Sequence, residues 1–393
     1  MNNLKTLIGY EYKKIFLRKS TWIIIVIAIF ITLLSCLADT WGTVYVDGKP
    51  AYSHYEEMMT DAEYTRALSG RIIDDVLIGE MQSAYNRVQD VPLAGATDEF
   101  QTYARPYSSI YALVRGITND VEAIDPTSFY ELRREKMLAL YQQANLSEVE
   151  IQKHLENDER VDKPLVFQHT SGYESIFGKF FTLGLSLTFL VSICLAPIFA
   201  NENSDRTAQL ILTSRYGKNK AILSKLITGI SFTLISAVIL LLLQCLPILY
   251  LRGFEGWDAP IQLALVTLSN PITLLEGVLI LCALVIIASI LIACIVMCLS
   301  AKLKNAFGVI TIISIFTMIC LFLNVADQYR FLSQLIDILP LRVTSENSIF
   351  TDYFYVVFNH CFTTYEIVPV IYGFLAILLL VFSYQSFKNQ QIG

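Results

Sequence analysis

The chain contains six apolar runs, each close to the length of a membrane-spanning helix. A transmembrane helix needs about 20 consecutive, mostly apolar residues. The composition agrees with this pattern, because 54% of the residues are hydrophobic and only 16% are charged; such values are typical of membrane proteins. We therefore expect an all-α polytopic membrane protein with six transmembrane helices, at residues 21–38, 177–200, 221–251, 271–299, 306–325 and 366–384.

Basic residues are distributed unevenly among the segments that connect these runs. They are frequent before the first run and after the second and fourth, whereas the connections after the third and fifth hold only Arg252, Arg330 and Arg342. Loops on the cytoplasmic side are enriched in lysine and arginine. Because an even number of spans places both termini on one side, we expect cytoplasmic N and C termini.

The long connection between the first two runs, residues 39–176, is then an extracellular domain. From position 39 to 178 the sequence has 24 acidic and 12 basic residues and no cysteine. The domain is therefore acidic and has no disulfides. Its negative surface either keeps it soluble or attracts cations and cationic peptides.

Local patterns predict that this domain is mainly helical. Capping-box sequences occur at 60–63 and 147–150, and Asp125-Pro126 is typical of a helix start. Apolar residues after the first box continue at helical spacing to Met81, which predicts one long helix. Residues 42–50 contain Asp47-Gly48 between short apolar segments, a pattern that predicts a β-hairpin.

The N-terminal segment 1–20 has apolar and charged residues at close to helical spacing, which predicts an amphipathic helix in the membrane interface. Its polar and aromatic residues at the interface are Tyr10, Glu11, Lys13, Lys14 and Arg18. A basic anchor on the cytoplasmic surface is a sufficient role for such a helix.

Two short segments within residues 326–365 have one apolar face each, around Phe331–Leu339 and Phe350–Phe358. They are too short to cross a membrane. We expect extracellular or re-entrant helices that line an outer opening; anchoring by an aromatic belt explains the pattern equally well.

The polar segment 201–220 lies between the second and third runs and therefore at one membrane surface. Leu210, Ile211 and Leu212 interrupt its polar residues, which predicts a short amphipathic helix able to present one face to a soluble partner.

No pattern of catalytic residues is found. The four histidines are scattered, none falls in a metal-binding motif, and no metal site is expected. Residues Gly172–Lys179 differ from a phosphate-binding loop by one extra residue between the glycines and by Phe180 in place of a hydroxyl. We expect no catalytic residue and no nucleotide or other cofactor bound by this chain. Polar residues at membrane depth, Gln244, Glu276 and Glu366, are candidates for a transport pathway.

The order of these features resembles the ABC-2 class of ATP-binding-cassette transporter permeases. In that family the segment after the second span is a coupling helix that binds a separate ATPase subunit. Ser224-Lys225 resemble the start of the next span, whereas Arg206 stands where glycine is common in the family. The coupling residues that the resemblance assigns are Glu202, Asp205, Arg206, Thr207, Leu210, Ile211, Leu212, Ser214 and Arg215.

This resemblance implies an exporter in the plasma membrane of a bacterium, embedded in the lipid bilayer. Its partners would be two ATPase subunits, which carry ATP and magnesium, and a second permease in a homodimer or heterodimer. No binding to nucleic acid is expected. The alternative is a membrane sensor or immunity protein whose acidic external domain binds a cationic peptide.

Overall fold

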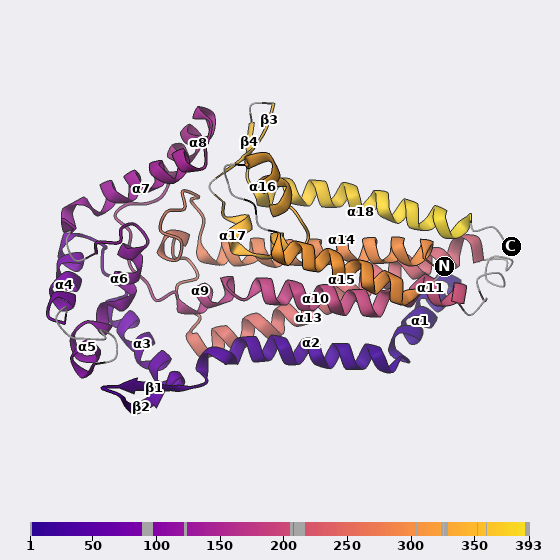
Figure 1. Ribbon diagram of the computed structural model, residues 1–393, viewed down its shortest axis with the longest axis horizontal. Coiled ribbons are helices and arrows are strands. Elements are labelled where there is room, and N and C mark those ends of the chain that lie inside the picture. Colours follow the sequence, from indigo (N-terminus) through magenta and orange to yellow (C-terminus); the bar gives the residue numbers. More distant parts are fainter. Residues whose placement is uncertain are drawn as a thin grey trace.

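Five long apolar helices of the computed structural model pack into an elongated bundle (Figure 1). Each is long enough and apolar enough to cross a membrane. They are α2 (Lys19–Leu37), α10 (Phe180–Leu195) continued by α11 (Pro197–Ser204), α13 (Ile222–Arg252), α14 (Leu274–Lys302) and α18 (Thr364–Lys388). The chain is thus a mostly helical polytopic membrane protein. The expected sixth span coincides with α15 (Ala306–Phe322), which is apolar but has only 17 residues. Six spans therefore stay a prediction.

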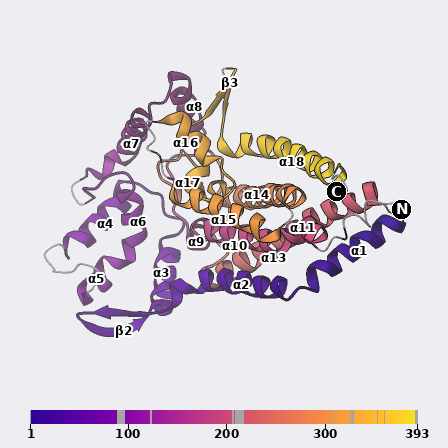
Figure 2. The same ribbon diagram turned by 45° about the vertical axis from the view of Figure 1, so that its right-hand side comes forward.

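The structure describes residues 2–88, 97–121, 124–204, 207, 217–303, 305–323, 325, 329–351, 353–358 and 360–389. Within them, α1 (Asn2–Phe16) and the end of α18 lie at one end of the bundle, and a helical domain formed by the 39–176 region lies at the other (Figures 1 and 2). The helices of this domain are α3 (His54–Leu68), α4 (Asp75–Asn86), α5 (Asp98–Tyr103), α6 (Ser108–Arg115), α7 (Phe129–Gln143), α8 (Glu148–Glu159) and α9 (Ser171–Phe177).

The predicted hairpin is confirmed as strands β1 (Thr43–Val46) and β2 (Lys49–Ser53), which pair antiparallel. Asp47 and Gly48 at its turn have φ values of 48° and 74°. Two consecutive residues with positive φ are the signature of the tight turn that Asp-Gly favours.

Helix α3 begins at His54, so the predicted start at the 60–63 capping box is wrong. Ser53 occupies the cap, because its hydroxyl accepts from Glu56 N and the Glu56 carboxylate accepts from Ser53 N at 2.7 Å. Thr60 instead donates to the Glu56 carbonyl inside the helix. The capping box at Ser53 binds the free N–H groups at the start of the helix. Thr60 therefore lies within α3 and does not cap a helix.

The predicted continuous helix to Met81 is also wrong. Helix α3 ends at Leu68, Gly70 adopts a φ of 87°, and α4 begins after Asp74, which caps Leu77 N at 2.9 Å. The expected helix starts farther on are confirmed. Asp125 caps a short 3₁₀ turn before α7, and Ser147 and Glu150 form a capping box at α8.

Residues 329–362 are only partly helical. Helix α16 (Arg330–Asp337) matches the first expected helix, and a short α17 (Glu346–Ile349) follows. The second expected helix, over 350–358, is wrong: β3 (Tyr355–Val357) and β4 (His360–Phe362) form an antiparallel hairpin instead. Aromatic and β-branched residues dominate these strands, and such residues favour extended pairing over helix.

Close helix packing and one helix break shape the centre of the bundle. A Cβ on Gly229 of α13 would lie 2.4 Å from Met297 Sδ of α14, so the missing side chain leaves room for the methionine to pack against α13. Pro197 separates α10 from α11 because proline cannot continue the helical hydrogen bonds. The Ser300 hydroxyl of α14 bridges the break: it donates to Ala196 O at 2.6 Å and accepts from Phe199 N and Ala200 N at 3.1 Å.

The N-terminal helix ends earlier than expected. α1 stops at Phe16, and α2 starts at Lys19 in a new direction (Figure 2). Trp22 Nε1 of α2 donates to Phe16 O at 2.9 Å and so satisfies a carbonyl that the helix end leaves free.

Candidate functional site

Four charged side chains meet where α1, α11 and α13 converge. Glu11 and Lys14 come from α1, Glu202 from α11, and Lys225 from α13. Glu11 and Lys14 share one face because three residues form almost one helical turn. We call these four residues the charge cluster. Its member Glu202 is the first residue of the polar 202–218 segment, and the cluster lies at the bundle end that carries α1.

Lys225 is the centre of the charge cluster. Its Nζ lies 2.9 Å from Glu11 Oε2 and 2.5 Å from Glu202 Oε1, and it donates to the Ile198 carbonyl at 3.0 Å. Lys14 Nζ completes the arrangement at 2.9 Å from Glu11 Oε1 and 3.0 Å from Glu202 Oε1. Each carboxylate therefore contacts both ammonium groups.

Burial makes this geometry costly to disturb. The Lys225 side chain is 1% exposed, and those of Glu11 and Glu202 are 10% and 8% exposed. The two positive and two negative charges balance, which offsets the desolvation that burial imposes. Burial alone would lower the pKa of Lys14, but Glu202 and Glu11 outweigh it and raise that pKa above its usual value.

Further contacts tie α1 to the bundle around the charge cluster. Tyr12 donates to the Ser231 hydroxyl of α13 at 2.8 Å, and Arg18 Nη1 donates to the Cys194 carbonyl of α10 at 3.4 Å. Of the other expected interfacial residues, Tyr10 is 59% exposed and Lys13 is exposed as well. One face of the predicted interfacial helix therefore packs against the bundle, and the opposite face is exposed.

Most of the expected coupling residues cannot be placed. Glu202 is in the charge cluster, and the Thr207 hydroxyl donates to the Glu202 carbonyl at 3.3 Å. The remaining predicted coupling residues lie outside the described residues: Asp205, Arg206, Leu210, Ile211, Leu212, Ser214 and Arg215. The chain is described again from a π-helical turn, Gly217–Ala221, that leads into α13.

The candidate pathway residues differ in their surroundings. Glu276 and Glu366 are exposed and belong to capping boxes, with Thr273 at the start of α14 and Thr363 at the start of α18. Capping gives both carboxylates a structural role. Gln244 is fully buried in α13, and its side-chain amide has no hydrogen-bond partner within the described part of the chain. A place in a pathway stays a prediction for all three.

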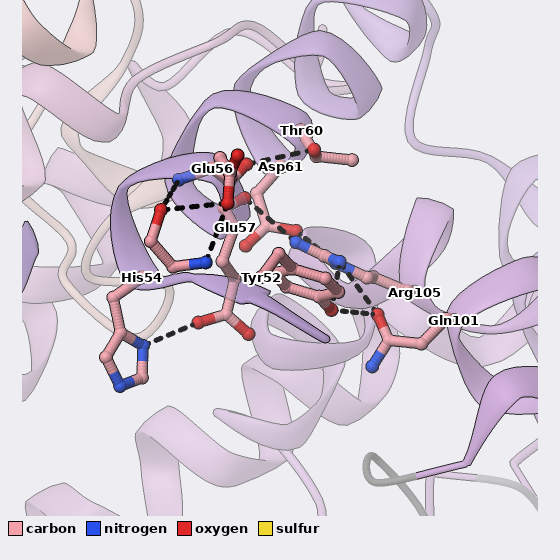
Figure 3. A network of polar contacts seen from close by, with 9 residues as sticks. Tyr52, His54, Glu56, Glu57, Thr60, Asp61, Gln101 and Arg105 are labelled. Carbon is pink, nitrogen blue, oxygen red and sulfur yellow. Dashed lines mark hydrogen bonds and ion pairs between the residues drawn. The ribbon is translucent and has the colours of Figure 1, made fainter. Parts of the chain in front are cut away.

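Arg105 joins three elements of the domain formed by residues 39–176 (Figure 3), which is called the external domain below because it lies outside the helical bundle. It is 7% exposed, and its guanidinium donates to Asp61 Oδ1, to the Tyr52 hydroxyl and to Gln101 Oε1, each at 2.7 Å. A fourth bond reaches the Glu57 carbonyl at 2.9 Å. One buried cation thus joins β2, α3 and α5.

A second buried arginine joins the external domain to the membrane bundle. Arg133 of α7 is 2% exposed and donates to Asp158 Oδ1 and to the Val266 carbonyl at 2.7 Å each, and to the Leu268 carbonyl at 3.2 Å. These two carbonyls belong to the connection between α13 and α14. In the same region His154 bonds the Ser269 hydroxyl at 2.6 Å.

Helix α8 binds the outer segment that precedes α18. Glu150, completely buried, accepts from Arg330 Nη2 of α16 and from Phe354 N at 3.1 Å. Burial by itself would raise the pKa of Glu150, but its bonds to Arg330, Ser147 and Phe354 lower it below the usual value. The external domain is therefore fixed to the bundle by charged groups at both of these outer connections.

These arrangements link separate elements of the fold through buried charged groups. Among the described residues, no group of three or more His, Cys, Asp or Glu side chains is placed to hold a metal ion. The sequence did not reveal that Glu11 and Lys225 contact Glu202 in one cluster. The feature that could have indicated it is the presence of charged residues within otherwise apolar helical segments. No family model, no curated protein and no solved structure matches this chain.

Proposed function

We propose that this chain is the membrane subunit of an ABC-2 class ABC transporter that exports its substrate from a bacterial cell. In this proposal a separate ATPase subunit, present twice, binds ATP and magnesium and docks on the 202–218 segment. Two permeases, identical or different, form the transport pathway between them. The observation that carries the proposal is the charge cluster, because it connects the start of that segment to two other helices.

The cluster provides a route for movement. A force applied to the 202–218 segment acts first on Glu202. Lys225 passes it to α13, and Glu11, bound to the same ammonium group, passes it to α1. A rigid, charge-balanced contact of this kind favours a concerted shift of three helices over independent motion of one. Such a shift is what a two-state transporter driven by a partner needs.

The position of the external domain supports the same proposal. The domain lies at the opposite end of the bundle from α1 (Figure 1), and Glu202, the first residue of the 202–218 segment, contacts Lys14 of α1. The basic residues of the N-terminal arm favour the cytoplasm for the α1 end. Energy would then enter from the cytoplasm, and the acidic domain would face outward.

Association with an ATPase is the first test. The full chain is co-expressed with candidate ATPases and purified, and stimulated ATP hydrolysis is measured in lipid vesicles. Leu210→Asp with Leu212→Asp is expected to abolish co-purification, because a charged face cannot fill an apolar groove. Lys49→Asp in the external hairpin is the control and should retain it. Normal association of the double variant contradicts the proposed docking site.

Coupling is tested separately from docking. Glu11→Gln with Lys225→Met removes one charge of each sign and leaves the Lys14–Glu202 pair. We expect this variant to bind the ATPase but to lose substrate-linked stimulation of hydrolysis. Lys5→Gln, on an exposed position of the same helix, should behave as the parent. Full stimulation in the double variant excludes the charge cluster from the coupling route.

A groove favours the second candidate, a sensor or immunity protein for a cationic peptide. It has a volume of about 680 Å³ between α8 and the start of α18. Its lining includes Glu148, Glu156 and Glu366 together with Lys153, which lies 3.7 Å from Glu156. Titration of a tetralysine peptide into the purified chain tests this function. Tight binding that Glu148→Gln with Glu156→Gln abolishes, together with no association with any ATPase, favours the sensor.

A further inference from the structure

A cavity of about 340 Å³ lies where α1 turns into α2, on the side of the bundle formed by α10 and α13. Its walls are almost entirely apolar. The lining residues are Tyr12, Phe16, Trp22, Ile25, Ile29, Leu190, Phe232, Ile235, Ser236, Ile239 and Leu240. We call it the α1–α2 cavity.

Aromatic rings frame the end of the cavity nearest α1. The Phe16 ring lies 6.3 Å from Tyr12, 5.7 Å from Trp22 and 6.1 Å from Phe232, measured between ring centroids. Tyrosine and tryptophan concentrate at the boundary between membrane hydrocarbon and headgroups. This position places the cavity just inside that boundary, at the bundle end that carries α1.

The cavity opens outward rather than toward the protein core. Trp22 is 54% exposed, Ile235 is 51% and Ile239 is 47% exposed, although all three belong to membrane-spanning helices. Apolar surface on such helices faces lipid, and water does not fill an apolar cavity of this kind. A flexible hydrocarbon chain is the occupant that matches both its walls and its surroundings.

Charge beside the cavity indicates the headgroup. Lys13 follows Tyr12 in α1 and lies one turn before Phe16, and Lys19 lies one turn before Trp22 in α2; both lysines are exposed. Exposed basic residues at a membrane surface attract anionic lipids.

We propose that the α1–α2 cavity binds an acyl chain of an anionic phospholipid, whose headgroup phosphate contacts Lys13 and Lys19. The proposal requires only that the bundle spans a membrane, and it does not depend on the transport function. The bound lipid fills the space between α1 and the bundle. It therefore supports the position of the helix that carries Glu11 and Lys14 of the charge cluster.

Trp22 provides a direct reporter of this lipid. The chain has three tryptophans, and the other two, Trp41 and Trp257, are exposed residues outside α2. The full chain with Trp41→Phe and Trp257→Phe is reconstituted in phosphatidylcholine vesicles that contain a small fraction of brominated phosphatidylglycerol. Parallel vesicles contain brominated phosphatidylcholine instead. Bromine quenches tryptophan fluorescence only on contact, so we expect phosphatidylglycerol to quench Trp22 roughly fivefold more effectively for each lysine engaged.

Two variants separate a specific site from ordinary lipid contact. Ser236→Phe fills the cavity and is expected to remove the preference for phosphatidylglycerol, whereas Val238→Phe, exposed on the same helix outside the lining, should keep it. Lys13→Gln with Lys19→Gln changes only exposed residues, preserves the apolar walls, and should make the two lipids equally effective. Equal quenching by both lipids in the parent, or a preference that survives Ser236→Phe or the double lysine variant, overturns the proposal. A second protein covering the cavity would show as weak quenching by both lipids, which also overturns it.

Discussion

Lys225 Nζ lies 2.9 Å from Glu11 Oε2, although 214 residues separate them in the sequence. The contact joins the first helix of the chain to the helix that follows the 202–218 segment. Glu202 contacts the same ammonium group at 2.5 Å. The three helices α1, α11 and α13 are therefore fixed relative to one another by a single buried nitrogen atom.

Replacing Lys225 with methionine is expected to destabilise the protein by about 3 kcal/mol or more, because it leaves two buried carboxylates with one partner. The measurement is thermal unfolding of the purified chain in detergent. Glu11→Gln in the same chain should recover part of the loss, since it removes one uncompensated charge. Lys5→Met, at an exposed position of α1, should change the unfolding temperature little. Equal stability of Lys225→Met and the parent would show that the charge cluster does not hold these helices together.

Ser300→Ala should destabilise the bundle by about 1–3 kcal/mol. The variant leaves Phe199 N and Ala200 N buried without their acceptor at the Pro197 break. Ser289→Ala is the matched control, because the Ser289 hydroxyl of the same helix bonds only to Val285 O, one turn earlier. Denaturant unfolding of the two variants checks this. Equal effects would mean that the Ser300 bridge contributes nothing beyond the loss of a hydroxyl.

Because of His169, we expect the free energy of unfolding to fall in mildly acidic solution. His169 Nε2 donates to the Arg252 carbonyl at 2.7 Å, and its Nδ1 forms a hydrogen bond with the Thr65 hydroxyl. Burial lowers the pKa of His169 below its usual 6.5, with Arg66 adding to the effect. The unfolded chain therefore binds the proton more readily. Stability is fully present above pH 6.5 and falls toward the lower folded pKa, by at most about 1.4 kcal/mol per pH unit.

The unfolding temperature measured between pH 5 and pH 8 checks this expectation. His169→Gln should be less stable than the parent at pH 7.5 but should show a flatter profile on the acidic side. His360→Gln, which alters an exposed histidine, should keep the profile of the parent. An unchanged acidic slope in His169→Gln would assign the pH dependence to other groups.

Arg133→Met is expected to loosen the external domain from the bundle. Asp158 and the carbonyls of Val266 and Leu268 each lose one donor, although Asp158 keeps Lys163 and the Leu268 carbonyl keeps Gln262. The loss of a buried charge partner costs about 3 kcal/mol. Limited proteolysis of the full chain should then cut the domain faster. Arg134→Met tests the specificity, because its side chain is exposed on the same helix. Similar cleavage of both variants would refute the anchoring role of Arg133.

Sequence patterns correctly predicted turns and helix starts that depend only on neighbouring residues. The hairpin at Asp47-Gly48 and the capping box at Ser147 follow from residues a few positions apart, and both are confirmed. The box at Thr60 failed because Ser53 offers a competing cap seven residues earlier. The expected helix over 350–358 failed because pairing with residues 360–362, which periodicity does not reveal, favours extended backbone.

The charge cluster could not be predicted for a different reason. Glu11, Glu202 and Lys225 are each unremarkable as single charges near the ends of apolar segments. Their contact depends on the direction of α1 relative to α2, which changes at Leu17, and on the helix break at Pro197. Tertiary packing sets both of these features and so determines which partners a buried charge finds. The spacing of residues along one helix does not reveal such packing.

The anchoring of the external domain also determines the order in which the protein can be completed during its synthesis. Residues 39–176 are made before the Val266 and Leu268 carbonyls that receive Arg133, and before the Arg330 side chain that pairs with Glu150. Until these later segments have been synthesised, Arg133 can bind only Asp158 and Glu150 can bind only Ser147, because their other partners among the described residues do not yet exist. The contacts that anchor the domain are therefore completed late, once Val266, Leu268 and Arg330 have been synthesised.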